Sequence, residues 1–213
     1  MLGDEPPDKD ISIKITLIGD SSVGKTCIIS RYVKDDFSEN SLLSTSGASY
    51  SEKIINKFNK TISLDLWDTA GQERYRAIGR HFYKKSYITC LIYDITNEAS
   101  FEHLKEIWYK ELKEFGEEVK IIAVVGNKND LYVNEKVKED DAKKFANEIG
   151  AVFKLTSAKT GDGVKELFDI LIDKYIEKLL PNLIKEYNGK KSSNKNILGG
   201  ISDINSQKCK KCC

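Results

Sequence analysis

The sequence has no hydrophobic run long enough to cross a membrane and almost no net charge. A spanning helix needs roughly 18 or more apolar residues in a row, whereas IIAVV at 121–125 has the length of a buried strand. The net charge of +1 gives no overall field that would attract nucleic acid or an acidic substrate. The first ten residues, MLGDEPPDKD, are acidic and contain no apolar stretch, so a secretion signal is not expected.

The chain does have enough apolar residues for one sizeable core. With 213 residues and 40% hydrophobic content, a single domain with tails is expected. Of the five cysteines, Cys27 and Cys90 lie in apolar contexts, which is typical of reduced core residues. The other three crowd into the last five positions, and this crowding needs its own explanation.

Apolar segments alternate with helical patterns over residues 11–180. The patterns predict strands at 11–18, 50–58, 61–67, 87–95, 119–126 and 151–157. They predict helices at 25–33, 98–115, 138–150 and 163–180, and a further helix that ends at Lys85. Nearly continuous apolar strands separated by helices indicate a parallel sheet covered on both faces. Because 50–58 and 61–67 flank Asn59-Lys60 as a hairpin, we predict an α/β sandwich of about six strands with one antiparallel edge.

The stretch LIGDSSVGKT, residues 17–26, places small residues between a predicted strand and a predicted helix. From Gly19 to Thr26 it fits the pattern G-x-x-x-x-G-K-[ST]. Such a loop lets successive backbone N–H groups point at phosphate oxygens, while Lys25 bridges the outer phosphates and the Thr26 hydroxyl binds Mg²⁺. The alternative, an ordinary strand–turn–helix connection, would leave a lysine unpaired at a buried strand end.

Two further motifs point to guanine. In GNKND, residues 126–130, the Asp130 carboxylate can accept hydrogen bonds from both N1–H and the exocyclic amine of guanine. Adenine offers no matching donors and would leave that buried charge unsatisfied. In TSAK, residues 156–159, the backbone N–H of Ala158 could reach the guanine carbonyl oxygen. Either motif alone also fits a surface turn, but both follow predicted strands, at the edge where open α/β sheets bind ligands.

WDTAGQE, residues 67–73, supplies a third element. Asp68 ends a predicted strand and can hold Mg²⁺ directly or through water, although it could instead cap the next helix. The Gly71 N–H can approach the γ-phosphate, and Gln72 could orient a water for in-line attack.

In order and spacing, these motifs resemble those of Ras-like small GTPases over residues 11 to 180. Trp67 before Asp-Thr-Ala-Gly, GQERYR after it, YDITN at 93–97 and the C-terminal cysteine pair are similar to Rab proteins. The resemblance implies a three-layer P-loop fold and a switch that slowly hydrolyses GTP with Mg²⁺ and recruits effectors to a membrane in vesicle trafficking. It also implies an exchange factor, a GTPase-activating protein, a GDP-dissociation inhibitor and a prenylation escort as partners.

The resemblance assigns roles to individual residues. Asn127, Asp130 and Ala158 would contact guanine, with the Lys128 stem over its plane and Phe37 beside it. Gln72 would be catalytic, and the metal ligands would be Thr26, Thr45 and Asp68. An effector-binding aromatic triad would comprise Tyr50, Trp67 and Phe82, for which core packing is the alternative. The full nucleotide-binding set would be Ser21, Ser22, Val23, Gly24, Lys25, Thr26, Cys27, Phe37, Thr45, Asp68, Gly71, Asn127, Lys128, Asp130, Ser157, Ala158 and Lys159.

The sequence departs from the Rab pattern around the expected switch. Ser46 stands where Rabs usually have isoleucine, the segment from Phe37 to Thr45 is one residue longer, and KKS follows Phe82-Tyr83. These changes leave the nucleotide motifs intact but affect partner choice, and they motivate a second hypothesis of a GTP-binding scaffold that does not switch. A third, an ATP-using P-loop kinase, is disfavoured by NKND and TSAK. Ala48 after Gly47 resembles the early-endosomal branch of Rabs.

The composition changes after Pro181. Residues 1–10 and 181–213 are expected to flank the GTPase domain as flexible ends, and 188–213, rich in Lys, Asn, Ser and Gly, is predicted to be disordered. Prenylation of the C-a-a-X type needs a cysteine where Lys210 stands. The Rab pattern instead implies geranylgeranyl groups on Cys212 and Cys213, with metal binding by the terminal cysteines as the alternative. Two lipids anchor stably, so we expect the cytoplasmic face of an endomembrane, such as an endosome, and a soluble cytosolic pool.

Overall fold

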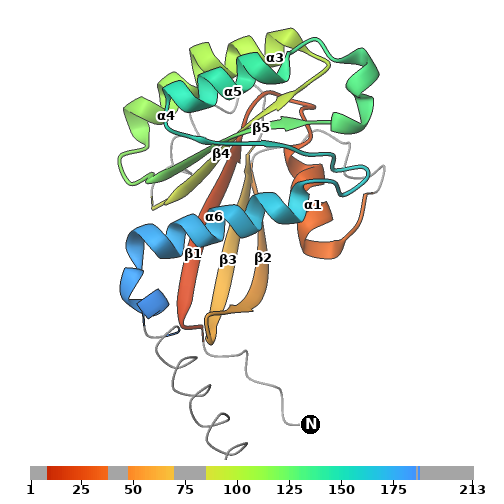
Figure 1. Ribbon diagram of the computed structural model, residues 1–213. Helices are drawn as coiled ribbons and strands as arrows, with labels where there is room; N and C mark the ends of the chain where they lie inside the picture. The colour runs from red at the N-terminus through yellow and green to blue at the C-terminus, as the bar shows by residue number, and fades with distance from the viewer. Residues whose placement is uncertain (1–8, 38–47, 70–84, 186, 188–213) are drawn as a thin grey trace, which may run out of the picture. The chain divides into compact units, whose positions relative to one another are not determined.

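The computed structural model describes residues 9–37, 48–69, 85–185 and 187 (Figure 1). Two compact units are distinguished, Met1–Tyr175 and Ile176–Cys213. The domain boundary expected near residue 180 stays a prediction. The tail at 188–213 and the helix expected before Lys85 fall outside the described residues.

The first unit contains a six-stranded sheet in the order β2-β3-β1-β4-β5-β6. The strands are β1 (Ile11–Ile18), β2 (Ala48–Lys57), β3 (Lys60–Thr69), β4 (Ile88–Asp94), β5 (Ile121–Asn127) and β6 (Val152–Leu155). All neighbours are parallel except β2, which pairs antiparallel with β3 at the edge. The predicted fold class, a mostly parallel sheet of about six strands, is therefore confirmed.

The β2–β3 turn corrects one detail. Its central residues are Phe58 and Asn59, with φ of 55° and 57°, so the turn lies one residue earlier than the predicted Asn59-Lys60. A two-residue hairpin whose twist matches its strands needs positive φ at both central positions. Asn59 tolerates this region, but a phenylalanine rarely adopts it. Phe58 therefore gave no signal of a turn position in the sequence.

The helices cover both faces of the sheet. They are α1 (Lys25–Lys34), α3 (Glu98–His103), the π-helix η3 (Leu104–Trp108), α4 (Tyr109–Phe115), the 3₁₀-helix η4 (Asn129–Asn134), α5 (Glu139–Glu148) and α6 (Val164–Leu179). Figure 1 shows α3, α4 and α5 on one face and α1 and α6 on the other. The predicted helix at 98–115 thus contains a π-turn. Residues 181–185 are helical again after the break at Leu180, since proline fits the first turn of a helix.

Buried side chains on both faces hold these layers together. All seven residues of β4 are buried. On the α3–α5 side, Phe101, Leu104 and Trp108 pack with Leu91 and Tyr93 of β4. On the other face the rings of Tyr32 in α1 and Phe168 in α6 stack at 3.8 Å. Full burial of such a side chain contributes about 1.5–3 kcal/mol.

The two internal cysteines belong to this interior. Cys27 is 4% exposed and Cys90 is fully buried, and both are free thiols. Burial raises the pKa of Cys90 to about 12, so the group stays protonated and unreactive at neutral pH. The prediction that both are core residues is confirmed.

The parallel strands bring the sequence motifs to one edge of the sheet. Leu17 of β1 is paired with Asp68 of β3, and Gly126 of β5 with Leu155 of β6. The carboxyl ends of β1, β5 and β6 therefore lead into residues 19–24, 128–130 and 156–159 at this edge, where Asp68 near the end of β3 also lies. β1 lies between β3 and β4, where the strand order of the sheet reverses. In open α/β sheets, ligands bind at the carboxyl ends of the strands at this point, which is where the loop after β1 lies.

Candidate nucleotide site

The loop Gly19–Gly24 connects β1 to α1, which begins at Lys25. Gly24 has φ of +96°, and a Cβ there would lie 2.3 Å from Nδ2 of Asn127, so glycine is required both by conformation and by space. Among the described residues, no side chain caps α1 and its first turn carries no acid. The N–H groups at the start of this ten-residue helix are thus suited to an anion.

Lys25 is buried at the start of α1, with 5% of its surface exposed. Its Nζ donates hydrogen bonds of 2.8 Å to the carbonyl oxygens of Gly19 and Asp20. Burial lowers the pKa of Lys25 to about 8, against the opposing attraction of Asp68 and Asp20. The loop itself therefore positions a partly desolvated cation, whose interaction with phosphate is stronger than it would be in water.

Thr26, which follows Lys25 in α1, forms a hydrogen bond with Asp68 of β3. Thr26 Oγ1 donates a 2.6 Å hydrogen bond to Asp68 Oδ2, and Asp68 is 1% exposed. A hydroxyl and a carboxylate are oxygen ligands of the kind Mg²⁺ prefers. The chemistry of this pair fits a magnesium ion, which Thr26 and Asp68 would hold. Thr45, the third expected ligand, lies outside the described residues.

Asn127 joins the phosphate loop to the predicted base-binding loops. Its Nδ2 donates to Val23 O at 2.8 Å. Its Oδ1 accepts from Thr156 Oγ1 and from the Ala158 backbone N–H, both at 3.2 Å. One buried amide, itself at the end of β5, thus contacts two other motif segments.

Hydrogen bonds also position the remaining base-side residues. Ser157 Oγ donates to Asp130 Oδ1 at 2.6 Å. Lys128 Nζ forms a 2.6 Å ion pair with Asp94 Oδ2, which links the loop after β5 to the end of β4. The Ser157 hydroxyl therefore orients the Asp130 carboxylate through one of its two oxygens.

Several of the predicted residues lie in parts of the chain that the structure does not describe. Thr45, Gly71, Gln72, Phe82, Cys212 and Cys213 lie outside the described residues, and their roles stay predictions. Ser21 is exposed, Ser22 has φ of 64°, Val23 and Cys27 are buried, and Phe37 is half-buried. These placements do not test contact with a nucleotide.

Tyr50 and Trp67, two members of the expected aromatic triad, are opposite each other on β2 and β3. Their ring centroids are 5.4 Å apart at 59°, and Tyr50 is 51% exposed. Such a pair is accessible to a partner in a way that core aromatics are not. Its use by effectors stays a prediction.

Sequence reasoning missed a set of contacts to Asp20. Trp108 Nε1 donates to Asp20 Oδ1 at 2.8 Å, and His103 Nδ1 lies 2.6 Å from Oδ2. On an α-helix, side chains five positions apart diverge by roughly 140°. The π-helix η3 begins after His103 and ends at Trp108, and its wider turn reduces this angle so that both side chains reach one carboxylate. No motif signals these contacts, nor the role of Asp94.

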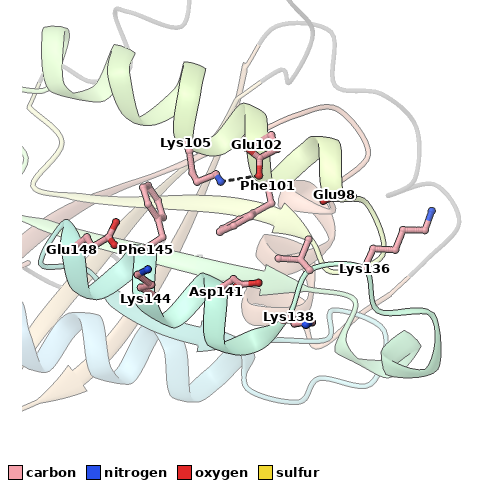
Figure 2. A pocket seen from close by; sticks show the side chains of 11 residues that line it. Glu98, Phe101, Glu102, Lys105, Lys136, Lys138, Asp141, Lys144, Phe145 and Glu148 are labelled. Atoms are coloured by element: carbon pink, nitrogen blue, oxygen red, sulfur yellow. Dashed lines mark hydrogen bonds and ion pairs between the residues drawn. The ribbon is translucent and has the colours of Figure 1, made fainter.

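A groove of about 280 Å³ lies between α3 and α5 (Figure 2). Phe101 and Phe145 contribute its aromatic surface. Four lysines and four carboxylates surround it, namely Lys105, Lys136, Lys138, Lys144, Glu98, Glu102, Asp141 and Glu148. The balanced charge does not favour polyphosphate, and none of the predicted site residues lines this groove.

Comparison with known proteins places this geometry in a family. The Ras family matches residues 14–177, more than half of the chain. Human Rab-22A is 42% identical over 156 residues, 73% of this chain and 79% of that protein. Mouse Rab-31 is 39% identical over 197 residues, 92% and 96% of the two chains. The chain belongs to the Rab family of small GTPases.

Coverage differs among the Rab relatives. Bovine Rab-26 is 37% identical over 159 residues, and the match spans only 62% of its length.

As a small GTPase, this Rab-family chain is a hydrolase and a GTP/GDP switch, and Ras-family GTPases generally use Mg²⁺ with GTP. None of its helices within the described residues is both long and apolar enough to span a bilayer.

Proposed function

We propose that this chain is a Rab-type switch that binds GTP and GDP with Mg²⁺ and recruits effectors to an endomembrane in vesicle trafficking. The observation that carries the proposal is the direct hydrogen bonding among the motif loops at one sheet edge. Thr26 contacts Asp68, and Asn127 contacts both Val23 and Ala158. This connectivity supports a single ligand that spans all of the loops.

In this proposal the two ends of the nucleotide meet different chemistry. Lys25 and the N–H groups at the start of α1 neutralise the phosphates, and Thr26 and Asp68 hold Mg²⁺. Asp130 accepts N1–H and the amine of guanine, while the Ala158 N–H donates to its carbonyl oxygen. Two supports for this assignment are the 2.6 Å Ser157–Asp130 bond, which fixes the carboxylate, and the nearly complete burial of Lys25.

For hydrolysis, Gln72 would orient water for in-line attack on the γ-phosphate, with the Gly71 N–H nearby. The bound Mg²⁺ would supply positive charge to the phosphate oxygens. We expect slow intrinsic turnover, with an arginine from a partner accelerating it by about 10³–10⁵-fold. The γ-phosphate would also bring Thr45 to the metal and so distinguish the GTP state from the GDP state.

Two measurements test this proposal: a single-turnover hydrolysis assay, and capture of effectors by the GTP-bound and the GDP-bound protein. Gln72→Leu should retain GTP, with and without a GTPase-activating protein, whereas Gln207→Leu should behave as wild type. Hydrolysis by Gln72→Leu at the wild-type rate would remove the role of Gln72. Equal effector binding in the GTP and GDP states would favour the non-switching scaffold.

Membrane attachment is a separate part of the proposal. Geranylgeranyl groups on Cys212 and Cys213 would anchor the chain, because two lipids give stable binding where one gives marginal binding. Mass spectrometry of protein from native cells should find two prenyl groups on these residues and none on Cys209. Unmodified Cys212 and Cys213 in the membrane fraction would refute this anchor.

The compartment follows from the same proposal. Similarity to Rab-22A and Rab-31, together with the Gly47-Ala48 dipeptide, supports an endosomal or related trafficking membrane, reached from a soluble cytosolic pool. Protein tagged at its N-terminus should colocalise with endosomal markers, and Cys212→Ser/Cys213→Ser should be diffuse. Membrane localisation of that double variant would contradict lipid-dependent targeting.

A further inference from the structure

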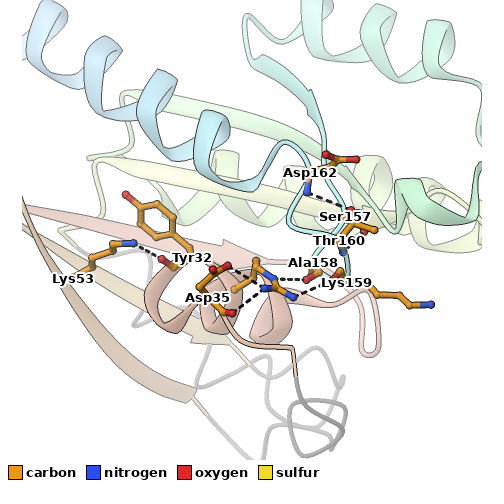
Figure 3. A network of polar contacts seen from close by, with 9 residues as sticks. Tyr32, Asp35, Lys53, Ser157, Ala158, Lys159, Thr160 and Asp162 are labelled. Carbon is orange, nitrogen blue, oxygen red and sulfur yellow. Dashed lines mark hydrogen bonds and ion pairs between the residues drawn. The ribbon is translucent and has the colours of Figure 1, made fainter.

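Arg31, near the end of α1, contacts the predicted guanine loop as well as its own helix. Its Nε donates to Ala158 O and its Nη2 to Lys159 O, each at 2.9 Å. Its Nη1 donates to Asp35 O at 2.8 Å and to Asp35 Oδ1 at 3.0 Å. Figure 3 shows this network between α1 and the loop that carries Ala158 and Lys159.

The two bonds to the loop use the planar fork of the guanidinium. Nε and Nη2 point in parallel at consecutive carbonyl oxygens, a geometry that arginine provides and lysine cannot reproduce. The Arg31 side chain is 17% exposed, so these bonds are partly shielded from water. They should therefore constrain the loop more than an exposed ion pair would.

One carbonyl that Arg31 holds belongs to Ala158, whose N–H contacts guanine in the proposed function. The Ala158 N–H points at Asn127 Oδ1, with a 3.2 Å separation at the long end of the hydrogen-bonding range. Ala158 is 3% exposed. Asn127 thus holds the peptide group before Ala158 through its N–H, and Arg31 holds the peptide group after it through its carbonyl oxygen. The two groups are connected through φ and ψ of Ala158, so fixing the second restricts the direction of the first.

We propose that Arg31 is a positioning residue for guanine recognition: by holding Ala158 O and Lys159 O, it aims the Ala158 N–H at the 6-carbonyl oxygen of the base. Arg31 itself does not touch the nucleotide. The inference rests on the proposed function, in which guanine occupies this site.

The competing explanation is that Arg31 is only a structural link between α1 and the loop, here called a staple. A staple would stabilise the fold and would affect all nucleotides equally. A positioning residue would affect only those nucleotides that use the 6-carbonyl oxygen. The two explanations therefore differ in base discrimination and not in stability.

The experiment measures dissociation constants of the full chain for three diphosphates. GDP has both the carbonyl oxygen and the 2-amino group, inosine diphosphate lacks the amine, and 6-thio-GDP replaces the oxygen with sulfur, a weak acceptor. The variants are Arg31→Lys and Arg31→Met. The matched control is Asp35→Asn, which removes the exposed partner charge, tolerates the local φ of 53° and leaves both loop bonds in place.

Wild type should prefer GDP to 6-thio-GDP, and both Arg31 variants should reduce that preference by about three- to tenfold, the loss expected for one hydrogen bond. Affinity for inosine diphosphate should fall in parallel with that for GDP. Asp35→Asn should keep the wild-type preference. If the preference is unchanged in Arg31→Lys, which keeps the charge and most of the packing, Arg31 is a staple and the inference is wrong.

A failure of the proposed function would look different. Wild type would then bind no GDP, or would bind GDP and 6-thio-GDP equally, and the Ala158 contact itself would be refuted along with the role of Arg31. Loss of GDP preference confined to the Arg31 variants supports the inference directly.

Discussion

The phosphate end and the base end of the proposed site are built in different ways. At the phosphate end, the buried Lys25 cation donates hydrogen bonds to backbone carbonyl oxygens, and the Thr26 hydroxyl donates one to the Asp68 carboxylate. At the base end, the side chains of Asn127 and Ser157 form hydrogen bonds that link the loop after β5 to the loop after β6. The first arrangement suits binding through charge, whereas the second suits discrimination through fixed direction. We therefore expect affinity and selectivity to be separable by mutation.

The largest effect is expected from Lys25→Ala. It removes the cation that is proposed to bind the phosphates, so GDP and GTP affinity should fall by about 2–5 kcal/mol without a change in base preference. Lys34→Ala, at the other end of the same helix, is the matched control. Isothermal titration calorimetry measures both, and a loss below twofold in Lys25→Ala would break the comparison at its phosphate end.

Asn127→Ala should affect both ends. It removes the donor to Val23 O and the acceptor for the Ala158 N–H, which leaves buried polar groups unsatisfied at a cost of about 1–3 kcal/mol each. Nucleotide affinity and the thermal midpoint of the nucleotide-free protein should both fall. Asn134→Ala is the exposed control. A variant that loses base preference but keeps its thermal midpoint would show that Asn127 does not link the two ends.

Asp130→Asn should change selectivity in a specific direction. The amide can donate where the carboxylate only accepted, so it suits xanthine, which carries a carbonyl oxygen in place of the 2-amino group. GDP affinity should fall by about 1.5–3 kcal/mol, as for a hydrogen bond to a charged group, while affinity for xanthosine diphosphate rises. Competition binding measures the ratio, with Asp140→Asn as control. An unchanged ratio would place guanine recognition elsewhere.

Removal of Mg²⁺ should have the smallest effect on the GDP complex. Chelation should raise the GDP dissociation rate by about tenfold, or about 1.4 kcal/mol, because it would remove the cation that Thr26 and Asp68 are proposed to hold. Asp68→Asn should weaken this response, whereas Asp65→Asn on the same strand should keep it. Stopped-flow release of a fluorescent GDP gives the rates, and an Asp68→Asn response equal to that of wild type would exclude Asp68 as a ligand.

Much of the fold could be predicted from the sequence because its signals are local. Apolar runs such as ITCLIYD give β4, and the glycine spacing after β1 gives the phosphate loop. The hairpin turn was misplaced by one residue because Phe58 adopts a conformation its side chain disfavours. The π-turn at Leu104–Trp108 has no local signal, since its apolar pattern also fits an α-helix.

The supporting contacts of the site could not be predicted in the same way. Arg31 and Ala158 are 127 positions apart, and Asp20 and Trp108 are 88 apart. Only the order of strands in the sheet brings such residues together. The motifs therefore identify the groups expected to touch the nucleotide, whereas the fold identifies the groups that hold them.

The ligand carried by the purified protein tests the central claim most directly. Protein isolated with Mg²⁺ present should release close to one equivalent of GDP or GTP on denaturation, as identified by ion-exchange chromatography against nucleotide standards. Nucleotide-free protein should rebind GDP, and excess ATP should not displace it. Release of an adenine nucleotide or of none, together with failure to bind GDP or GTP in the presence of magnesium, would contradict the account.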